Sequence, residues 1–316
     1  MPGSPSAVVL LGAQRFDPTL AAALSRQYVT GRIALITAGW QERESEDEEL
    51  REHLAPRETV NLMLHARGEQ LFRDDPELRA AHRERQEALR HRQDFYRIRV
   101  EQALEAERII RKRPAPPDIA AEQRQASVDA IRELDTWHLA NSARLHAEFE
   151  KRWSLSERPS VMKHRREIAS IVKGCAAIAI AGGHVATLIN RMSLFGIGPL
   201  AGGRIVFAWS GGAMAVSDRV VLFHDDPPQG PGASEVLDKG LGLVPDVVAL
   251  PQPEQRLNLE RPERVQILAR RFAPAICLAL PSGSSVVFRQ DRFVRSDGAV
   301  ELREDGSHGL FHAEGR

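Results

Sequence analysis

The chain is poor in cysteine, in net charge and in long apolar runs, and each shortage excludes a class of protein. Cys175 and Cys277 are the two cysteines of a 316-residue sequence, which rules out a disulfide framework and suits a reducing compartment. The 43 basic residues balance 43 acidic ones, so no overall charge draws the chain to nucleic acid. No apolar run approaches the ~20 residues that span a bilayer, and the first residues lack the basic region of a signal peptide. We therefore expect a cytoplasmic protein with no nucleic-acid and no membrane partner.

Glycine is absent from residues 74–156, and this change of composition divides the chain into three segments. Residues 1–73 and 157–316 alternate short apolar runs with helical patterns, as the two parts of one α/β core would. Strands are expected at 7–11, 33–37, 176–181, 205–209, 220–223, 247–250 and 275–280, and a helix over 44–67. An antiparallel tail at 285–289, 292–295 and 299–302, with a turn at 296–298, is expected to precede a frayed end at 303–316. The sequence thus predicts an α/β fold with a mainly parallel sheet that is covered on both faces.

The segment between these two parts predicts a long antiparallel helical hairpin, with helices at 76–113 and 117–153. Prolines between 114 and 117 break the helical pattern, and Asp118 follows them near the start of the second helix. Basic and acidic residues are interleaved, which is typical of a solvated helix face. The expected apolar seam consists of Leu89, Phe95, Tyr96, Leu104, Leu134, Trp137, Leu145 and Phe149. One small domain cannot bury the whole apolar face of so long a hairpin. Part of that face is therefore expected to form a homo-oligomer interface or to contact another partner.

The run Ile205-Val206-Phe207-Ala208-Trp209-Ser210-Gly211-Gly212-Ala213 has the sequence form of a nucleophile elbow. A buried strand ends abruptly at Ser210, and small residues stand two positions before and after it. The segment that follows can start a helix, whose free N–H groups suit a developing oxyanion. We expect Ser210 in a sparsely populated backbone region, with the N–H groups of Gly183 and Gly211 facing one cavity.

Three motifs in this order resemble the peptidase E and cyanophycinase group, the serine peptidases of family S51. They are the Gly-Gly pair at 182–183, the Ala-Trp-Ser-Gly-Gly-Ala run at 208–213 and the Gly-Leu-Gly-Leu-Val-Pro run at 240–245. The resemblance covers residues 7–72 loosely and 174–302 well, and it leaves the hairpin without a counterpart. It implies a class I glutamine amidotransferase-like fold, a three-layer sandwich with an inserted helical hairpin. It also implies Ser210 as nucleophile, Gly211 and Gly183 as the oxyanion hole, amide hydrolysis through an acyl-enzyme, and no cofactor.

The chain departs from this family where the general base and its acidic partner belong. The base position falls on Gln252, and the acidic motif falls on Leu280-Pro281-Ser282-Gly283, which holds no carboxylate. Glutamine can hydrogen-bond a serine but cannot take its proton, so we expect Gln252 to lie near Ser210 without activating it. Arg256, beyond it, is a candidate for binding a carboxylate of the substrate together with Gln252.

Two histidines at strand ends are candidate replacements for the missing base. His184 follows the Gly-Gly pair, and His224 precedes Asp225 and Asp226, either of which is a candidate acidic partner. Together His184, His224 and Asp225 lack the spacing of a known metal motif, so no metal is expected. Two function classes stay open. One is a serine hydrolase that cuts a small peptide or isopeptide-like amide. The other is an inactive binding or scaffolding module that uses the hairpin for partner docking or self-association.

Overall fold

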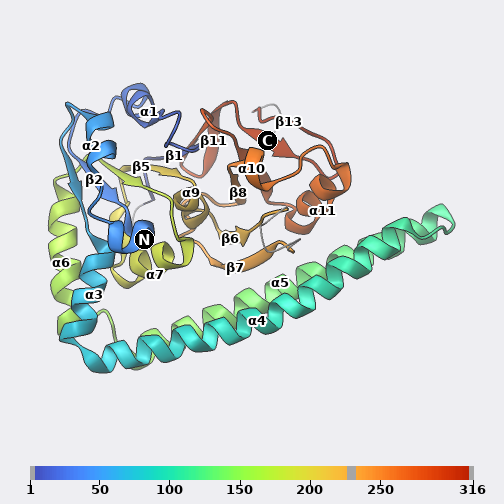
Figure 1. Cartoon of the computed structure of the whole chain (residues 1–316), viewed down its shortest axis with the longest axis horizontal. Coiled ribbons are helices and arrows are strands. Elements are labelled where there is room, and N and C mark those ends of the chain that lie inside the picture. Colours follow the sequence, from blue (N-terminus) through green and yellow to red (C-terminus); the bar gives the residue numbers. More distant parts are fainter. Residues whose placement is uncertain (1–3, 226–232, 313–316) are drawn as a thin grey trace.

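The computed structural model describes residues 4–225 and 233–312, and it places a long helical hairpin along one side of an α/β body (Figure 1). The central sheet has seven strands in the order β11-β10-β1-β5-β4-β2-β3. Its parallel strands are β1 (Ala7–Leu11), β2 (Ile33–Ile36), β3 (Thr59–Asn61), β4 (Ala177–Ile180) and β5 (Ile205–Trp209). An antiparallel pair, β10 (Ser285–Arg289) and β11 (Arg292–Asp297), extends the sheet beside β1. The predicted α/β class with a mainly parallel sheet is confirmed.

Alternate residues of the central strands pack into two separate apolar layers, because successive side chains along a strand point to opposite faces of the sheet. Val8, Leu10 and neighbouring residues face a layer that holds α3 (Leu64–Asp74), α6 (Pro159–Lys173) and α7 (Val185–Leu194). Val9 and Leu11 face a second layer, which holds α1 (Leu20–Arg26) and α2 (Glu48–Leu54). Helices therefore cover both faces of the sheet, which gives the expected three layers.

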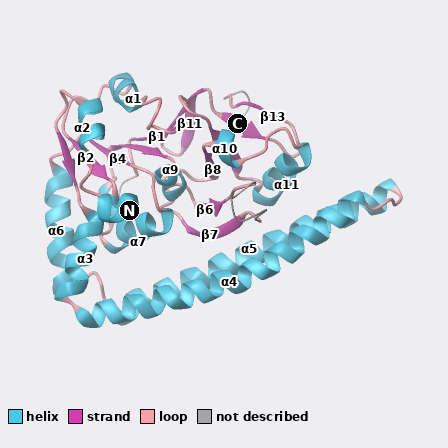
Figure 2. Cartoon of the chain, in the orientation of Figure 1, coloured by secondary structure: helices cyan, strands magenta, loops and turns pink. Residues whose placement is uncertain are grey.

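The second half of the chain adds a smaller sheet and a short ribbon (Figure 2). The smaller sheet has the order β13-β12-β9-β8. Its strands are β8 (Val247–Pro251), β9 (Ile276–Leu280), β12 (Val300–Leu302) and β13 (His308–Leu310), with α10 (Pro253–Arg256) and α11 (Pro262–Phe272) beside them. The ribbon pairs β6 (Arg219–Leu222) with β7 (Glu235–Lys239). The remaining short helices are η1 (Ala38–Arg43), α8 (Ile197–Leu200) and α9 (Gly211–Val216).

Three local expectations need correction. Residues 44–67 do not form one helix, because α2 ends before Pro56 and β3 follows before α3 begins. The turn expected at 296–298 is narrower than predicted, because Ser296 and Asp297 belong to β11 and the chain bends only at Gly298, whose φ is 72°. The segment 303–316 is not frayed throughout, since His308–Leu310 pairs with β12, and residues 313–316 lie outside the described part.

The predicted hairpin is confirmed as α4 (Pro76–Lys112) and α5 (Pro117–Trp153). The Asp75 side chain accepts a hydrogen bond from the Leu78 N–H and caps α4, while Pro76 and Pro117 occupy first-turn positions where no donor is lost. Each helix has 37 residues, which corresponds to a length of roughly 55 Å. In Figure 1 the hairpin follows the body past β7 and α11, and its tip extends beyond them.

The apolar seam of the hairpin differs from the predicted one. Tyr96 and Phe149 are buried as expected, and Leu89, Leu104, Leu134 and Leu145 are half-buried. Phe95 and Trp137 are 67% and 49% exposed, so their assignment to the seam is wrong. Phe95 and Tyr96 are neighbours in sequence and therefore point about 100° apart around the helix. Only Tyr96 turns toward the body.

A buried polar network fastens the hairpin to the body. Arg271 of α11 pairs with Asp135 of α5 at 2.6 Å, and both side chains are less than 5% exposed. The Tyr96 hydroxyl donates to Asp135 at 2.6 Å and accepts from Arg271 at 2.8 Å. Burial raises the pKa of Tyr96, so its hydroxyl keeps its proton and remains a donor. The ring of His138 stacks on Tyr96 at 4.2 Å and extends this contact along α5.

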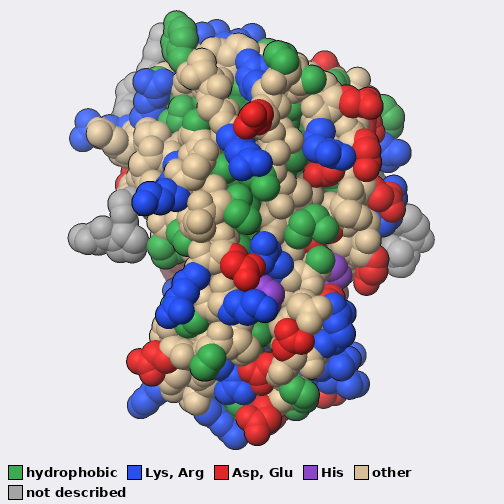
Figure 3. Space-filling model, turned by 90° about the vertical axis from the view of Figure 1, so that its left-hand side faces the viewer, with side chains coloured by type: hydrophobic (Ala, Val, Ile, Leu, Met, Phe, Trp, Pro, Cys, Tyr) green, Lys and Arg blue, Asp and Glu red, His purple; other side chains and the backbone are tan. Residues whose placement is uncertain are grey.

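The face of the molecule at the base of the hairpin carries interspersed charges of both signs (Figure 3). Its apolar side chains are scattered between these charges, as on most protein surfaces. None of the helices in the described ranges is both long enough and apolar enough to cross a membrane.

Candidate functional site

Ser210 lies between β5 and α9 in a strained backbone conformation. Its φ is 51° and its ψ is −127°, a region that residues with a side chain rarely occupy. The strand before it is buried from Val206 to Trp209, whereas Ser210 itself is partly exposed. The side chain makes no capping hydrogen bond to α9. The hydroxyl is therefore presented at the carboxyl end of the central sheet, where α/β folds place their ligands.

Glycines make this tight geometry possible. A Cβ on Gly182 would lie 2.6 Å from the Cβ of Ser210, and a Cβ on Gly212 would meet the carbonyl oxygen of Ile180. Gly39, after β2, and Gly183, after β4, also touch through their backbones, and neither has room for a Cβ. We call the meeting point of Gly39, Gly182, Gly183, Ser210 and Gly211 the Ser210 corner. It joins the ends of three adjacent strands, β2, β4 and β5.

Two backbone donors lie beside Ser210 in this corner. A Cβ on Gly211 would be 3.6 Å from the nitrogen of Gly183, and a Cβ on Gly182 would be 3.1 Å from the nitrogen of Gly211. In the described ranges neither N–H has a hydrogen-bond partner. Gly183 has a φ of 103°, which only glycine adopts readily. Two free N–H groups at the carboxyl ends of adjacent strands can stabilise a negatively charged oxygen.

A second strained turn stands on the other side of β4, and the sequence analysis missed it. Gln41 has a φ of 57° and a ψ of −122°, close to the values of Ser210. Its side-chain amide donates to the Thr187 hydroxyl at 3.1 Å. The sequence does carry a signal for this turn. The small residues Ala38 and Gly39 follow β2, just as small residues flank Ser210 after β5.

The Thr187 group fixes the ring of His184. The Thr187 hydroxyl lies 2.8 Å from the Nδ1 atom of His184, and the Thr187 N–H donates to the same atom at 3.2 Å. Since Gln41 donates to the Thr187 hydroxyl oxygen, that hydroxyl has its own proton free to give to Nδ1. His184 is thus the N-cap of α7, with Nδ1 as an acceptor. A neutral imidazole in this state carries its proton on Nε2, which favours a donor over a general base.

The second candidate histidine has no carboxylate partner in the described residues. His224 is half-buried, and its Nδ1 atom is buried without a hydrogen-bond partner. The Asp225 carboxylate accepts from Arg264 at 2.6 Å and from the Asn258 N–H at 2.7 Å. Asp225 is therefore engaged in an ion pair with α11. Asp226, the other candidate acid, lies outside the described residues.

Gln252 precedes α10 and Arg256 is its last residue, and both lie next to the loop that holds His224. Gln252 has left-handed backbone, and its N–H donates to the Leu280 oxygen at 3.2 Å, so the two positions that the family resemblance singles out are adjacent. The Asp225 N–H donates to the Arg256 oxygen at 2.9 Å. These contacts link the predicted residues into two groups, one at the Ser210 corner with His184 and one around α10 with His224. The elements that carry them also touch, because β8, which leads into Gln252, packs against α9, which follows Ser210. That Gln252 lies near Ser210 stays a prediction. A path of contacts joins the groups through β1, where Leu11 pairs with Trp209 and the Gly12 N–H donates to the Ser284 oxygen.

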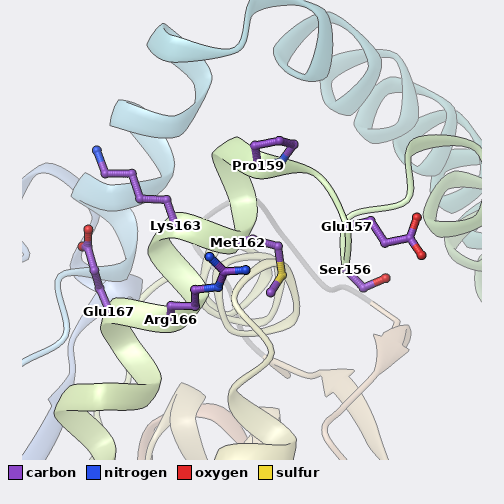
Figure 4. A pocket seen from close by; sticks show the side chains of 7 residues that line it. All are labelled: Ser156, Glu157, Pro159, Met162, Lys163, Arg166 and Glu167. Carbon is purple, nitrogen blue, oxygen red and sulfur yellow. The ribbon is translucent and has the colours of Figure 1, made fainter.

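The part of the chain that the structure describes brings no metal-binding cluster to these groups. The described residues contain no group of three or more His, Cys, Asp or Glu that is arranged to hold a metal ion. A surface hollow of about 510 Å³ lies elsewhere, between α6 and the turn before it (Figure 4). Met162 and Arg166 of α6 point toward Ser156 across it. None of the residues that line this hollow belongs to the Ser210 corner.

Comparison with known proteins shows likeness in fold only. No protein-family model and no curated protein sequence matches the chain. The structure is similar to that of a peptidase from an acI-B1 actinobacterium, with 13% sequence identity, a TM-score of 0.48, and coverage of 98% of this chain and 99% of that one. It is also similar to a peptidase E protein from Listeria monocytogenes EGD-e, with 10% identity, a TM-score of 0.43, and coverage of 93% and 98%. At such identities the function has to be argued from the geometry of the site.

Proposed function

We propose that this protein is a serine hydrolase of the peptidase E and cyanophycinase kind, which cleaves a small peptide or isopeptide-like amide through an acyl-enzyme on Ser210. The observation that carries the proposal is the pairing of a strained, partly exposed serine with two free backbone donors. Backbone strain of this kind persists only where the surrounding structure enforces it. The glycines of the Ser210 corner provide that enforcement.

In the proposed reaction the Ser210 hydroxyl oxygen attacks the carbonyl carbon of the amide. The carbonyl oxygen becomes negatively charged and accepts hydrogen bonds from the N–H groups of Gly183 and Gly211. A base removes the hydroxyl proton and passes it to the leaving nitrogen, so that the C–N bond breaks and an ester to Ser210 remains. Water then attacks the ester by the same steps and releases the acid.

We assign a donor role to His184, because Nδ1 of His184 already accepts from Thr187, and we propose His224 as the base. This assignment requires the loop after β6 to bring the His224 ring to the Ser210 hydroxyl. Asp225 is held by Arg264, so His224 lacks the carboxylate that orients a histidine in a full triad. In serine proteases the loss of that carboxylate costs about 10⁴-fold in turnover. We therefore propose that the enzyme turns over slowly. Its substrate carries a carboxylate that Arg256 and Gln252 can bind, and the two buried free thiols fit a cytoplasmic location.

The test is covalent labelling of the purified chain by a fluorophosphonate probe, followed by hydrolysis of dipeptides and β-aspartyl peptides. We expect labelling and slow hydrolysis by the wild type, and neither by Ser210→Ala. His224→Ala is expected to lose most of the rate. Equal background rates in the wild type, Ser210→Ala, His184→Ala and His224→Ala would reject the enzyme.

A binding or scaffolding module is the second candidate, and the surroundings of Gln252 favour it. The adjacent positions 252 and 280–283 hold no histidine and no acid, although they meet in space. If no probe labels Ser210 at any pH, the same two N–H groups would serve as an anion-binding cradle. Retention of a carboxylate ligand by both the wild type and Ser210→Ala would support this module.

A further inference from the structure

The hairpin exposes an apolar stripe on the side that faces away from the body. Five of the nine large hydrophobic side chains that are exposed in the described residues belong to this hairpin, and we call them the outer stripe: Phe95, Ile98, Ile109, Ile119 and Trp137. Their exposed fractions range from 48% to 67%. In Figure 1 no described element covers this side of the hairpin.

The members of the outer stripe lie on one face of each helix, with polar residues between them. Phe95, Ile98 and Ile109 fall within an arc of about 60° around α4, and Ile119 and Trp137 are separated by about five full turns of α5. Arg99 links the two helices, because its guanidinium lies 4.3 Å above the ring of Trp137 and its Nε donates to the Phe95 oxygen. Phe95 and Trp137 therefore stand at the same level, directly behind the stacked pair of Tyr96 and His138.

Charge along the distal half indicates what covers this stripe. Residues 95–112 of α4 carry five Arg and Lys against three Glu, whereas residues 117–134 of α5 carry four acids against two Arg. The hairpin is thus basic along one helix and acidic along the other. A second copy related by a two-fold axis parallel to the hairpin sets α4 of each protomer against α5 of its partner, so the helices that face each other carry opposite net charge.

We propose that two copies of this chain associate through their outer stripes and form a four-helix bundle. Every neighbouring pair of helices in that bundle is antiparallel, as in up-down bundles. Phe95 and Ile98 of one protomer pack against Trp137 of its partner, because these residues stand at one level. Aromatic side chains contribute a disproportionate share of the binding free energy at protein interfaces. The inference does not depend on the proposed hydrolase, since Ser210 lies on another part of the molecule.

Sedimentation equilibrium and light scattering on the full chain test the proposal. We expect a wild-type dimer, and a dissociation constant raised about tenfold or more by Phe95→Glu and by Trp137→Glu. Phe16→Glu is the matched control, because Phe16 is 88% exposed outside the hairpin and its change should leave the dimer intact. Far-UV circular dichroism should be the same for all four proteins. A wild type that stays monomeric, or a dimer that both hairpin variants leave unchanged, overturns the proposal.

Cysteine cross-linking tests the direction of the bundle. Cys175 and Cys277 are 6% and 1% exposed and will not react in the folded chain. Ile98→Cys and Trp137→Cys chains, mixed and oxidised, should give a disulfide between unlike chains. A cross-link between two Ile98→Cys chains would place α4 on α4 and contradict the arrangement.

Discussion

The Ser210 corner and the helical hairpin differ in which atoms hold them together. In the corner the main chain makes the contacts, since Gly39, Gly183 and Gly212 have backbone neighbours where a Cβ would stand. In the hairpin side chains make them, through Arg271, Asp135 and the apolar residues around Tyr96. A change in the corner therefore acts on the geometry of the proposed reaction. A change in the hairpin acts on the stability of a joint.

Breaking the joint should have the largest effect. Arg271→Met leaves the Asp135 carboxylate buried without its cation, and we expect it to lower the free energy of unfolding by about 3–5 kcal/mol. Urea denaturation at neutral pH measures this. Arg26→Met is the control, because Arg26 and Asp297 are more than half exposed and their pair should contribute less than about 1 kcal/mol. Similar losses in both variants would contradict the buried joint.

Adding one methyl group to the corner should stop the chemistry and spare the hairpin. Gly183→Ala forces a left-handed residue and pushes a Cβ into the Gly39 oxygen, so we expect the rate of probe labelling at Ser210 to fall about 10²–10³-fold. Gly198→Ala is the control, because no atom lies within 4 Å of the position of its Cβ. Labelling of Gly183→Ala at the wild-type rate would remove Gly183 from the oxyanion hole.

The base of the hairpin should be sensitive to acid. His82 packs against Phe72 at 4.7 Å, and burial, followed by the positive charges of Arg85, Arg191 and His146, lowers its pKa to about 3. The unfolded chain binds this proton near pH 6.5 and the folded chain only near pH 3, so acid favours unfolding between these values. We expect the free energy of unfolding to drop by about 1–2 kcal/mol from pH 7 to pH 5 on account of His82. His82→Phe should flatten that slope, whereas His308→Phe, at an exposed strand, should leave it unchanged.

The smallest effect concerns the role of His184. Asparagine can still donate a hydrogen bond, so His184→Asn should keep labelling within about threefold of the wild type, and His184→Ala should lose about tenfold. Nitrogen NMR of the histidine rings should show the proton of His184 on Nε2. If both variants lose all activity to the same extent, His184 is the base and the donor role is wrong.

The sequence predicts most of the fold because most strands carry their own signal, although β3, β7 and β13 fall where no strand was expected. The seven expected strands begin and end within about one residue of those observed, since buried parallel strands are short apolar runs with sharp ends. The hairpin is equally predictable, because a proline stands at the start of each of its helices. What the pattern could not show is which stripe of α4 meets the body. That depends on β7 and α11, whose contacts come from distant parts of the chain.

The candidate site was predicted only where it is local. Ser210 and its glycines stand together in the sequence, so the strained turn could be inferred from small residues around one serine. Gln41 reaches Thr187 from a distant part of the chain, and no local pattern predicts that contact, whereas His184 and Thr187 are only three residues apart. The engagement of Asp225 by Arg264 belongs to the same kind of contact, and adjacency to His224 wrongly favoured a pair between them.

The joint around Tyr96 also makes the distal hairpin a lever. From Tyr96 to the end of α4 at Lys112 the helix rises by about 24 Å, and in Figure 1 the tip has no body beneath it. A rotation of about 10° at the joint would swing that tip by about 4 Å at this arm length. A small repacking beneath Arg271 is thereby converted into a displacement the size of a side chain at the far end.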